Sequence, residues 1–409
     1  MTWLVPPGAV PGAERLVLAR ALRGAVDGFA SLVLVAYLRE LGYSPGAIGG
    51  LVTATLVGSA ALTLAVGLAG ARLRERAVLF GACALMFATG LGLAGFTAFG
   101  PLLAVAFAGT LNPSDGDVSV FLPTEQALLA DAVAGSDRVA LFARYNLAGA
   151  LAGGVGSLAA GLPVALEGAL GLSRLGSLRA SLALYGLAAL PIAWLYTGLP
   201  ARAGSAAPEA PRAPLSRSRA VVLRLTALFS LDSLGGGFAV KAMLALWLFQ
   251  RFGFSIQAAG SVFFVSALLA GFSQLASARL AARIGLIPTM VYTHLPANAF
   301  LVLAAFMPSA PLAVAFLLLR MAFSQMDVPA RQAYVMAIVP PEERAAAASV
   351  TNVPRSLASA LSPSLAGALL ALSSFGWPLV IGGALKITYD LLLLAQFRNA
   401  PPPEESALR

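Results

Sequence analysis

The sequence predicts an all-α membrane protein with about twelve transmembrane helices, arranged as two six-helix repeats that run in the same direction. The first reason is composition, because 59% of the residues are hydrophobic and only 11% are charged, whereas soluble domains have roughly 45–50% and about 25%. The second is a series of apolar runs, each reaching the ~20 residues that cross a bilayer as a helix. The third is an internal repeat of polar residues.

Twelve apolar runs define the predicted spans. They are residues 16–41, 46–70, 77–98, 101–125, 140–163, 176–199, 220–250, 256–280, 286–307, 311–337, 346–372 and 376–397. Each should be a helix, because a backbone polar group without a hydrogen bond costs several kcal/mol in lipid. Segment 200–219 is rich in Pro, Ala, Ser and Arg and predicts a linker. It separates an N-terminal bundle, 1–199, from a C-terminal bundle with a short tail, 220–409.

Two spans carry signals of unusual backbone or packing. Residues 112–116 read NPSDG and should interrupt the helix of the fourth span. Irregular backbone at bilayer depth is tolerated only where protein or a water-filled cavity receives it. Residues 149–161, GALAGGVGSLAAG, place small side chains on a helix face in the fifth span, which predicts a close approach to another helix.

Arginines gather in alternate loops between the spans. The richer set of loops contains Arg72, Arg138, Arg217 and Arg283, whereas three loops of the opposite set have no cation. By the positive-inside rule the richer side is cytoplasmic, and both termini lie there. The net charge of +9 therefore reflects membrane topology, and no nucleic acid is expected as a partner.

Residues of the first half, several of them polar, recur in order in the second half at nearly constant spacing. The matched pairs are Pro123 with Pro329, Gln126 with Gln332, Ala127 with Ala333, Arg138 with Arg344, and Asn146 with Asn352. The tripeptide Gly-Phe-Ala also recurs, at Gly28 and Gly237, and Gly42 and Ser44 match Gly253 and Ser255. Because each half has an even number of spans, the repeats share one orientation and are related by an axis along the membrane normal.

Twelve spans, a duplication of six, a basic central linker and basic loops after the second and eighth spans resemble the major facilitator superfamily. The stretch 67–76, GLAGARLRER, is similar to the loop signature of that family, although Ala71 replaces its acidic residue. The resemblance implies gating loops that contain Gly67, Arg72, Arg76, Arg138, Arg283, Gly285 and Arg344. It further implies a monomeric multi-pass transporter of a bacterial cytoplasmic (inner) membrane, and the glycine-rich fifth span loosely resembles efflux-type permeases.

Ionisable side chains inside the apolar runs form the candidate site, because a charge at bilayer depth costs at least ~2.5–3.5 kcal/mol and usually faces a cavity or a partner. In the fold that the resemblance implies, spans 1, 4, 7 and 10 line the cavity. Their charged residues, which we expect to bind substrate or protons, are Arg23, Asp27, Asp115, Asp117, Asp232, Lys241, Arg320 and Asp327. Arg23 and Asp27 are expected to pair at i,i+4.

Other charged residues are expected to have structural roles. Lys386 and Asp390 stand at i,i+4 in the last span and predict a local ion pair in an outer helix. His294, the only histidine, predicts a hydrogen-bonded structural group. Glu125 and Arg331 are expected to make gate or loop contacts near the cytoplasmic end of the cavity.

Three functions stay open. The first is proton-coupled export of a small molecule, with Asp27 or Asp232 raised in pKa by burial as the proton carrier and Lys241 as a counter-ion or substrate anchor. The second is a carrier or exchanger for an organic or phosphorylated anion, bound by Arg23, Arg320 and Lys241. The third is a sensor on a transporter fold that does not transport.

An enzyme is not expected. The sequence has no Gly-rich loop followed by Lys and Ser or Thr for nucleotide phosphates. Its lone cysteine and lone histidine lie in separate spans, which predicts no metal-ligand cluster. We therefore expect no cofactor and no metal. The expected partners are a small-molecule substrate, protons and the lipid bilayer.

Overall fold

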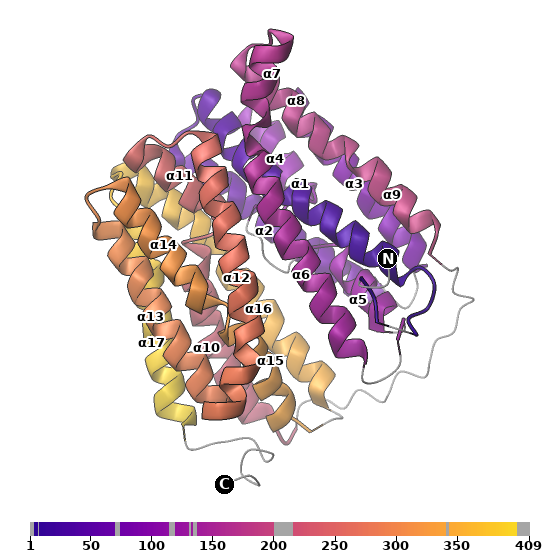
Figure 1. Cartoon of the computed structure of the whole chain (residues 1–409), viewed down its shortest axis with the longest axis vertical. Helices are drawn as coiled ribbons and strands as arrows, with labels where there is room; N and C mark the ends of the chain where they lie inside the picture. The colour runs from indigo at the N-terminus through magenta and orange to yellow at the C-terminus, as the bar shows by residue number, and fades with distance from the viewer. Residues whose placement is uncertain are drawn as a thin grey trace. The chain divides into compact units, whose positions relative to one another are not determined.

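The computed structural model contains only helices in the residues that it describes, which are 4–6, 8–69, 74–113, 119–130, 132–133, 137–199, 216–340 and 343–398 (Figure 1). The helices are α1 (Ala13–Glu40), α2 (Pro45–Ala69), α3 (Glu75–Gly95), α4 (Phe99–Ala108), α5 (Leu122–Ala130), α6 (Asp137–Leu158), η1 (Ala159–Gly161), α7 (Leu162–Leu170), α8 (Arg174–Leu187), α9 (Ala189–Thr197), α10 (Arg219–Gly237), α11 (Lys241–Phe252), α12 (Ile256–Ile284), α13 (Leu286–Phe306), α14 (Ala310–Ser324), α15 (Asp327–Ile338), α16 (Arg344–Leu372) and α17 (Trp377–Phe397).

Eleven stretches of the described chain are helical, long and apolar enough to cross a membrane, and Phe99–Ala108 is a shorter apolar helix. They follow the predicted spans closely, which confirms the predicted fold class. The difference lies in the fourth span, where α4 ends at Ala108 and α5 begins at Leu122. This break confirms the interruption that Pro113 and its polar neighbours predict, because proline removes a helical hydrogen bond.

Other spans are also broken. The glycines Gly235, Gly236 and Gly237 end α10, and Val240 is extended before α11 begins, since consecutive glycines have low helix propensity. Between α14 and α15 the helix stops at Gln325. The predicted seventh and tenth spans are therefore each two helices in series.

Two turns show the sequence repeat as local structure. Gly42 after α1 and Gly253 after α11 both have positive φ, 81° and 65°, a conformation that glycine adopts without strain. The serine that follows each glycine then caps the next helix: Ser44 Oγ accepts from the Ala47 amide at 3.3 Å and Ser255 Oγ from the Ala258 amide at 3.1 Å. Residues at matched positions of the repeat thus form the same type of turn and the same type of helix cap.

The chain forms two compact units. Unit 1 contains Met1–Ser205 with Val240–Phe264, and unit 2 contains Ala206–Ala239 with Val265–Arg409. The break between α10 and α11 coincides with the point at which the chain passes from unit 2 into unit 1.

In unit 1, α1 packs against α6 and α3 packs against α8. The α1–α6 contact is so close that a Cβ on Gly28 would overlap the carbonyl of Gly153, and one on Gly24 would overlap that of Gly149. This confirms the close approach predicted from the small residues of 149–161. Such small-residue contacts allow packing between helices where lipid supplies no hydrophobic driving force.

Unit 2 repeats this packing with α10 against α16 and α13 against α17. A Cβ on Gly237, the repeat partner of Gly28, would overlap the carbonyl of Ser359. The apolar core of this unit includes Phe229, Tyr334 and Tyr389. The first helix of each unit therefore packs through a matched glycine.

The N-terminus of α10 is held by the side chain of Glu343. Its Oε1 accepts from the Ser216 hydroxyl at 2.8 Å, the Ser216 amide at 3.2 Å and the Arg217 amide at 3.0 Å, and its Oε2 accepts from the hydroxyl and the amide of Ser218. These groups stabilise the carboxylate over the acid. The hydrogen bonds, led by the one from the Ser218 hydroxyl, lower the pKa of Glu343 to about 2.

We expect Glu343→Gln to lower the thermal unfolding midpoint at neutral pH, because the amide accepts with one oxygen and carries no charge. A lowered carboxyl pKa stabilises the fold fully above its ordinary value of 4.5, and this contribution is lost as the pH falls toward about 2. The difference between the midpoints of wild type and variant should therefore shrink across that pH range. An equal difference at pH 3 and pH 7, measured in one detergent, would contradict the assignment.

Candidate functional site: two buried charge networks

Unit 1 buries an ion pair between α1 and α5. The Arg23 guanidinium binds Glu125, and their side chains are only 2% and 0% exposed. The Tyr145 hydroxyl donates to the same carboxylate, as does that of Tyr196 at 2.5 Å. Arg23 also stacks over the ring of Phe121, with 4.4 Å from Cζ to the centroid. A buried pair is tolerated when further hydrogen bonds satisfy its remaining atoms, and this one holds α5 to α1.

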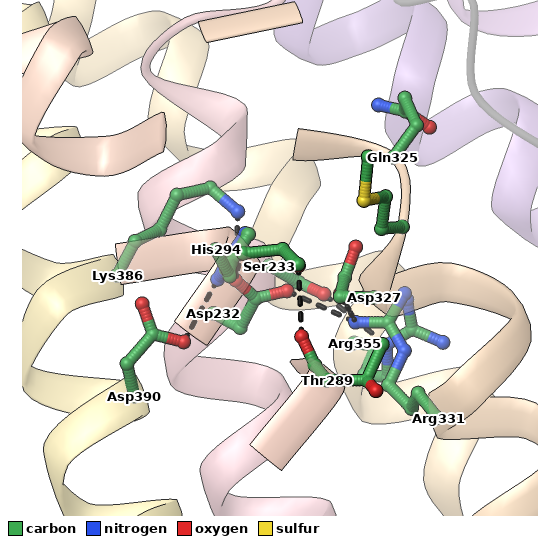
Figure 2. A network of polar contacts seen from close by, with 12 residues as sticks. Asp232, Ser233, Thr289, His294, Gln325, Asp327, Arg331, Arg355, Lys386 and Asp390 are labelled. Carbon is green, nitrogen blue, oxygen red and sulfur yellow. Dashed lines mark hydrogen bonds and ion pairs between the residues drawn. The ribbon is translucent and has the colours of Figure 1, made fainter. Parts of the chain in front are cut away.

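Unit 2 buries a larger network centred on Asp232 of α10 (Figure 2). Its Oδ1 lies 2.7 Å from Lys386 Nζ of α17, and its Oδ2 lies 3.1 Å from Arg331 Nη1 of α15. His294 Nε2 of α13 is 3.7 Å from Oδ1. Arg331 also contacts Asp327 at 3.5 Å. Four helices thus meet through one carboxylate.

The network continues from His294 to a second carboxylate. His294 Nδ1 lies 2.9 Å from Asp390 Oδ1. The Asn298 amide donates to Asp390 Oδ2 at 3.1 Å, and its nitrogen is 3.1 Å from His294 Nδ1. Asp390 and Asn298 are fully buried, and His294 is 3% exposed. Both ring nitrogens of the histidine therefore face an aspartate.

The two networks share one feature at repeat-related positions on the first helix of each unit. Arg23 precedes Gly28 by the same number of residues as Asp232 precedes Gly237. Both side chains are buried and both form an ion pair. The cation of one unit therefore stands where the other has an anion.

The partners of these residues are matched as well. Glu125 follows Pro123 at the same distance as Arg331 follows the repeated Pro329. Each ion pair thus joins the first helix of its unit to the second half of a broken span, with the two charges exchanged between units. We call each of these pairs a pin, the unit 1 pin being Arg23–Glu125 and the unit 2 pin Asp232–Arg331.

The predicted site residues fall into several places. Arg23, Asp232 and Asp327 belong to the networks. Asp27 lies beside the Tyr185 hydroxyl of α8, and Lys241 Nζ donates to Ser157 Oγ at 3.0 Å within unit 1. Arg320 lies on α14, where its Nη1 contacts Met321 Sδ at 3.4 Å. Asp115 and Asp117 lie outside the described residues.

The predicted gating residues are only partly described. Arg76 donates to the Thr197 carbonyl at 3.2 Å, Arg283 is exposed near the end of α12, and Gly285 links α12 to α13 with φ of 91°. Arg72 lies outside the described residues. The side chains of Arg138 and Arg344, and the surroundings of Gly67, also lie outside them, although all three residues are on helices.

Local spacing missed the direct partners of two buried cations. Arg23 forms an ion pair with Glu125, and Asp27 is a further charge that acts on it. Lys386 forms an ion pair with Asp232. In both cases a carboxylate on another helix approaches the cation more directly than one on the same helix. Glu125 and Arg331, expected as gate or loop contacts, are the partners that sequence reasoning missed. Their opposite charges beside the repeated prolines were the available signal.

Two similar bundles of membrane-spanning helices, each with charges buried at its centre, define a membrane transporter of the duplicated six-helix type. The chain belongs to the Major Facilitator Superfamily, whose family model matches residues 16–322 and 225–409.

Similar proteins cover nearly the whole chain. An uncharacterized membrane protein of Saccharomyces cerevisiae, YJR124C, is 25% identical and covers 90% of each chain. The nucleoside transporter NupG has a TM-score of 0.71 at 14% identity and covers 95% of this chain and 100% of its own. The xylose transporter XylE from E. coli has a TM-score of 0.72 at 14% identity, covering 97% and 99%. Such different substrates on one fold mean that substrate must be argued from the site.

Proposed function

We propose that this multi-pass membrane protein exchanges a small organic molecule for protons. Its family and fold support secondary transport by alternating access. Export is the direction we propose, from the likeness of the fifth span to efflux-type permeases, with both termini in the cytoplasm from the distribution of arginines. A monomer in a bacterial inner membrane is the simplest setting for that topology.

The single histidine of the unit 2 network carries the proton-coupling proposal. Among the described residues, ion pairs connect three carboxylates, Asp232, Asp327 and Asp390, to Arg331, Lys386 and His294. Two further cations, Arg320 and Arg355, interact with Asp232 through their charge. An unbalanced charge in a low-dielectric interior is costly. His294 is the residue type that gains a charge between pH 5 and 8. A proton gained or lost at His294 therefore changes the net charge around Asp232.

A carrier for an organic or phosphorylated anion is the second candidate, and Arg320 favours it. This guanidinium lies on a membrane-spanning helix, and none of the ion pairs found among the described residues includes it. Its Nε is buried and makes no hydrogen bond within the same part of the chain. A carboxylate or phosphate on the substrate would supply the missing partner.

The first test is a thermal-shift screen of the purified full chain against neutral, cationic and anionic small molecules. A ligand at 100 times its dissociation constant adds ~2.7 kcal/mol to the free energy of unfolding. Binders restricted to anions, and lost in Arg320→Gln, would favour the anion carrier. The hit is then loaded into proteoliposomes. We expect an inward pH gradient of one unit to drive its exit to about a tenfold concentration ratio for one-to-one exchange, since 1.4 kcal/mol is a factor of ten.

A protonophore should abolish this accumulation but leave exchange of labelled for unlabelled substrate intact. Flux that equilibrates the substrate at the same final ratio with and without the pH gradient would contradict proton coupling. Binding without any flux would instead indicate the sensor that the sequence left open.

A further inference from the structure

We infer that the coupling proton is bound at His294, on α13 and against Asp390 of α17, and that Asp232 is the fixed anion that this proton acts upon. The inference rests on the proposed proton-coupled function and names its site. It also moves the site away from the first helices of the units, where the sequence placed it with Asp27 or Asp232, to two helices expected to stand outside the cavity.

The comparison between the two units distinguishes the ion pair that both contain from the additional groups found in unit 2. Both contain a pin with exchanged charges, so a buried ion pair at this position is a shared structural requirement. In unit 1 the further donors to the carboxylate are the hydroxyls of Tyr145 and Tyr196, which stay neutral at physiological pH because tyrosine ordinarily ionises near 10. In unit 2 the corresponding surroundings are ionisable. These surroundings include His294, the residue type that gains a charge between pH 5 and 8.

The geometry gives the two nitrogens of His294 different tasks. Nδ1 lies 2.9 Å from Asp390 Oδ1, a distance at which Nδ1–H donates to the carboxylate and fixes the tautomer. Nε2 then carries the free lone pair, and it points at Asp232 Oδ1 from 3.7 Å. A proton bound at Nε2 forms the new N–H bond with that lone pair. The ring becomes an imidazolium between two aspartates, and the network gains one positive charge.

Charged and titratable groups surround this ring on every packed helix. They are Asp390, Lys386 and Tyr389 of α17, Asp232 of α10, and Asp327 and Arg331 of α15. Arg320 of α14 and Arg355 of α16 act on the ring through Asp232, with which both interact. The carboxylates favour the imidazolium and the cations oppose it. Lys386 opposes it most directly, because its Nζ lies 2.7 Å from the same Asp232 oxygen. Substrate that binds near these cations would alter that balance.

Protonation is thereby linked to the unit 2 pin. The Oδ1 atom of Asp232 faces both Lys386 and His294, while its Oδ2 holds Arg331 of α15. An imidazolium at 3.7 Å competes with Lys386 for Oδ1 and weakens the hold of the carboxylate on its other partners. Because α15 is the second half of a broken span, a weaker contact between Asp232 and Arg331 allows α15 to move. The protonated and unprotonated states of the network therefore favour different positions of α15.

The test uses the fact that His294 is the only histidine of the chain. Tag-free wild-type protein labelled with 15N-histidine gives a single imidazole, whose nitrogen shifts report its protonation without any assignment. We expect one titration, and we expect saturating substrate from the screen to shift its midpoint. An imidazole that keeps one protonation state from pH 5 to 9, with and without substrate, would overturn the inference.

Transport by His294→Gln is the second arm. We expect this variant to exchange labelled for unlabelled substrate, to lose gradient-driven accumulation, and to move no protons in a pH-dye assay. Tyr196→Phe, which removes a neutral donor from the buried network of unit 1, is the matched control that should retain all three activities. Proton-driven accumulation by His294→Gln would overturn the inference while leaving the proposed function in place. Wild-type transport that moves no protons would remove both.

Discussion

Glu125→Gln is expected to lower the free energy of unfolding of the protein by about 3–5 kcal/mol, the usual effect of removing one partner from a buried ion pair. Arg23 would remain charged and 2% exposed, without the carboxylate that neutralises it. Tyr145 and Tyr196 would lose a charged acceptor at the same time. The measurement is the unfolding midpoint of the purified variant in a mild detergent, with expression level as a second readout.

The chain offers an exposed ion pair as the matched control. Arg174 and Glu40 lie 3.0 Å apart with side chains that are 61% and 37% exposed, and such pairs contribute only ~0–1 kcal/mol. Glu40→Gln should therefore leave the midpoint nearly unchanged. Equal effects of Glu125→Gln and Glu40→Gln would show that burial of the pin adds nothing to its strength.

Exchanging the charges of the unit 1 pin should restore most of the lost stability. In the double variant Arg23→Glu with Glu125→Arg, the guanidinium would face the two tyrosine hydroxyls, which can accept as well as donate hydrogen bonds. Unit 2 already uses the exchanged order, with the anion on its first helix. Recovery by the double variant, but by neither single change, is the result that a true pairwise interaction requires.

The spans could be predicted from sequence because hydrophobic length and helix breakers are local properties. The break near Pro113 and the close contact of α1 with α6 both followed from residues adjacent in the chain. Most of the predicted linker, 200–219, lies outside the described residues. The repeat was also visible, since proline, glycine and serine have the same backbone task in both halves. At Gly42 and Gly253 that task is a turn with positive φ.

The partners of the buried charges could not be predicted in the same way. Spacing at i,i+4 identifies neighbours on one helix, whereas Arg23 and Lys386 are neutralised by residues distant in sequence. His294 gave no sequence signal beyond being the only one of its kind, because its role depends on aspartates from α10 and α17. The opposite charges of Glu125 and Arg331 would have pointed to the pins if the repeat had been applied to every charged residue.

Asp232→Asn is expected to destabilise the protein at least as much as Glu125→Gln, by about 3–5 kcal/mol or more, because it leaves two buried cations without their shared carboxylate. Lys386 and Arg331 lie 2.7 and 3.1 Å from its oxygens. Among the described residues, the ion-pair partner that remains for Arg331 is Asp327, at 3.5 Å. Thermal unfolding in the same detergent gives the comparison, and a midpoint close to that of wild type would mean that Asp232 is not the centre of the network.

We expect the exchange of charges to fail in unit 2, although the same exchange should succeed in unit 1. In Asp232→Arg with Arg331→Asp, the new guanidinium on α10 would stand against Lys386, and also against His294 whenever that residue is protonated. Like charges at this depth repel without water to screen them. We therefore expect the double variant to be no more stable than Asp232→Asn, and to improve when Lys386→Gln is added. Full recovery by the double exchange alone would show that Lys386 and His294 contribute little to the field at Asp232, and the asymmetry between the two repeats would then have no electrostatic basis.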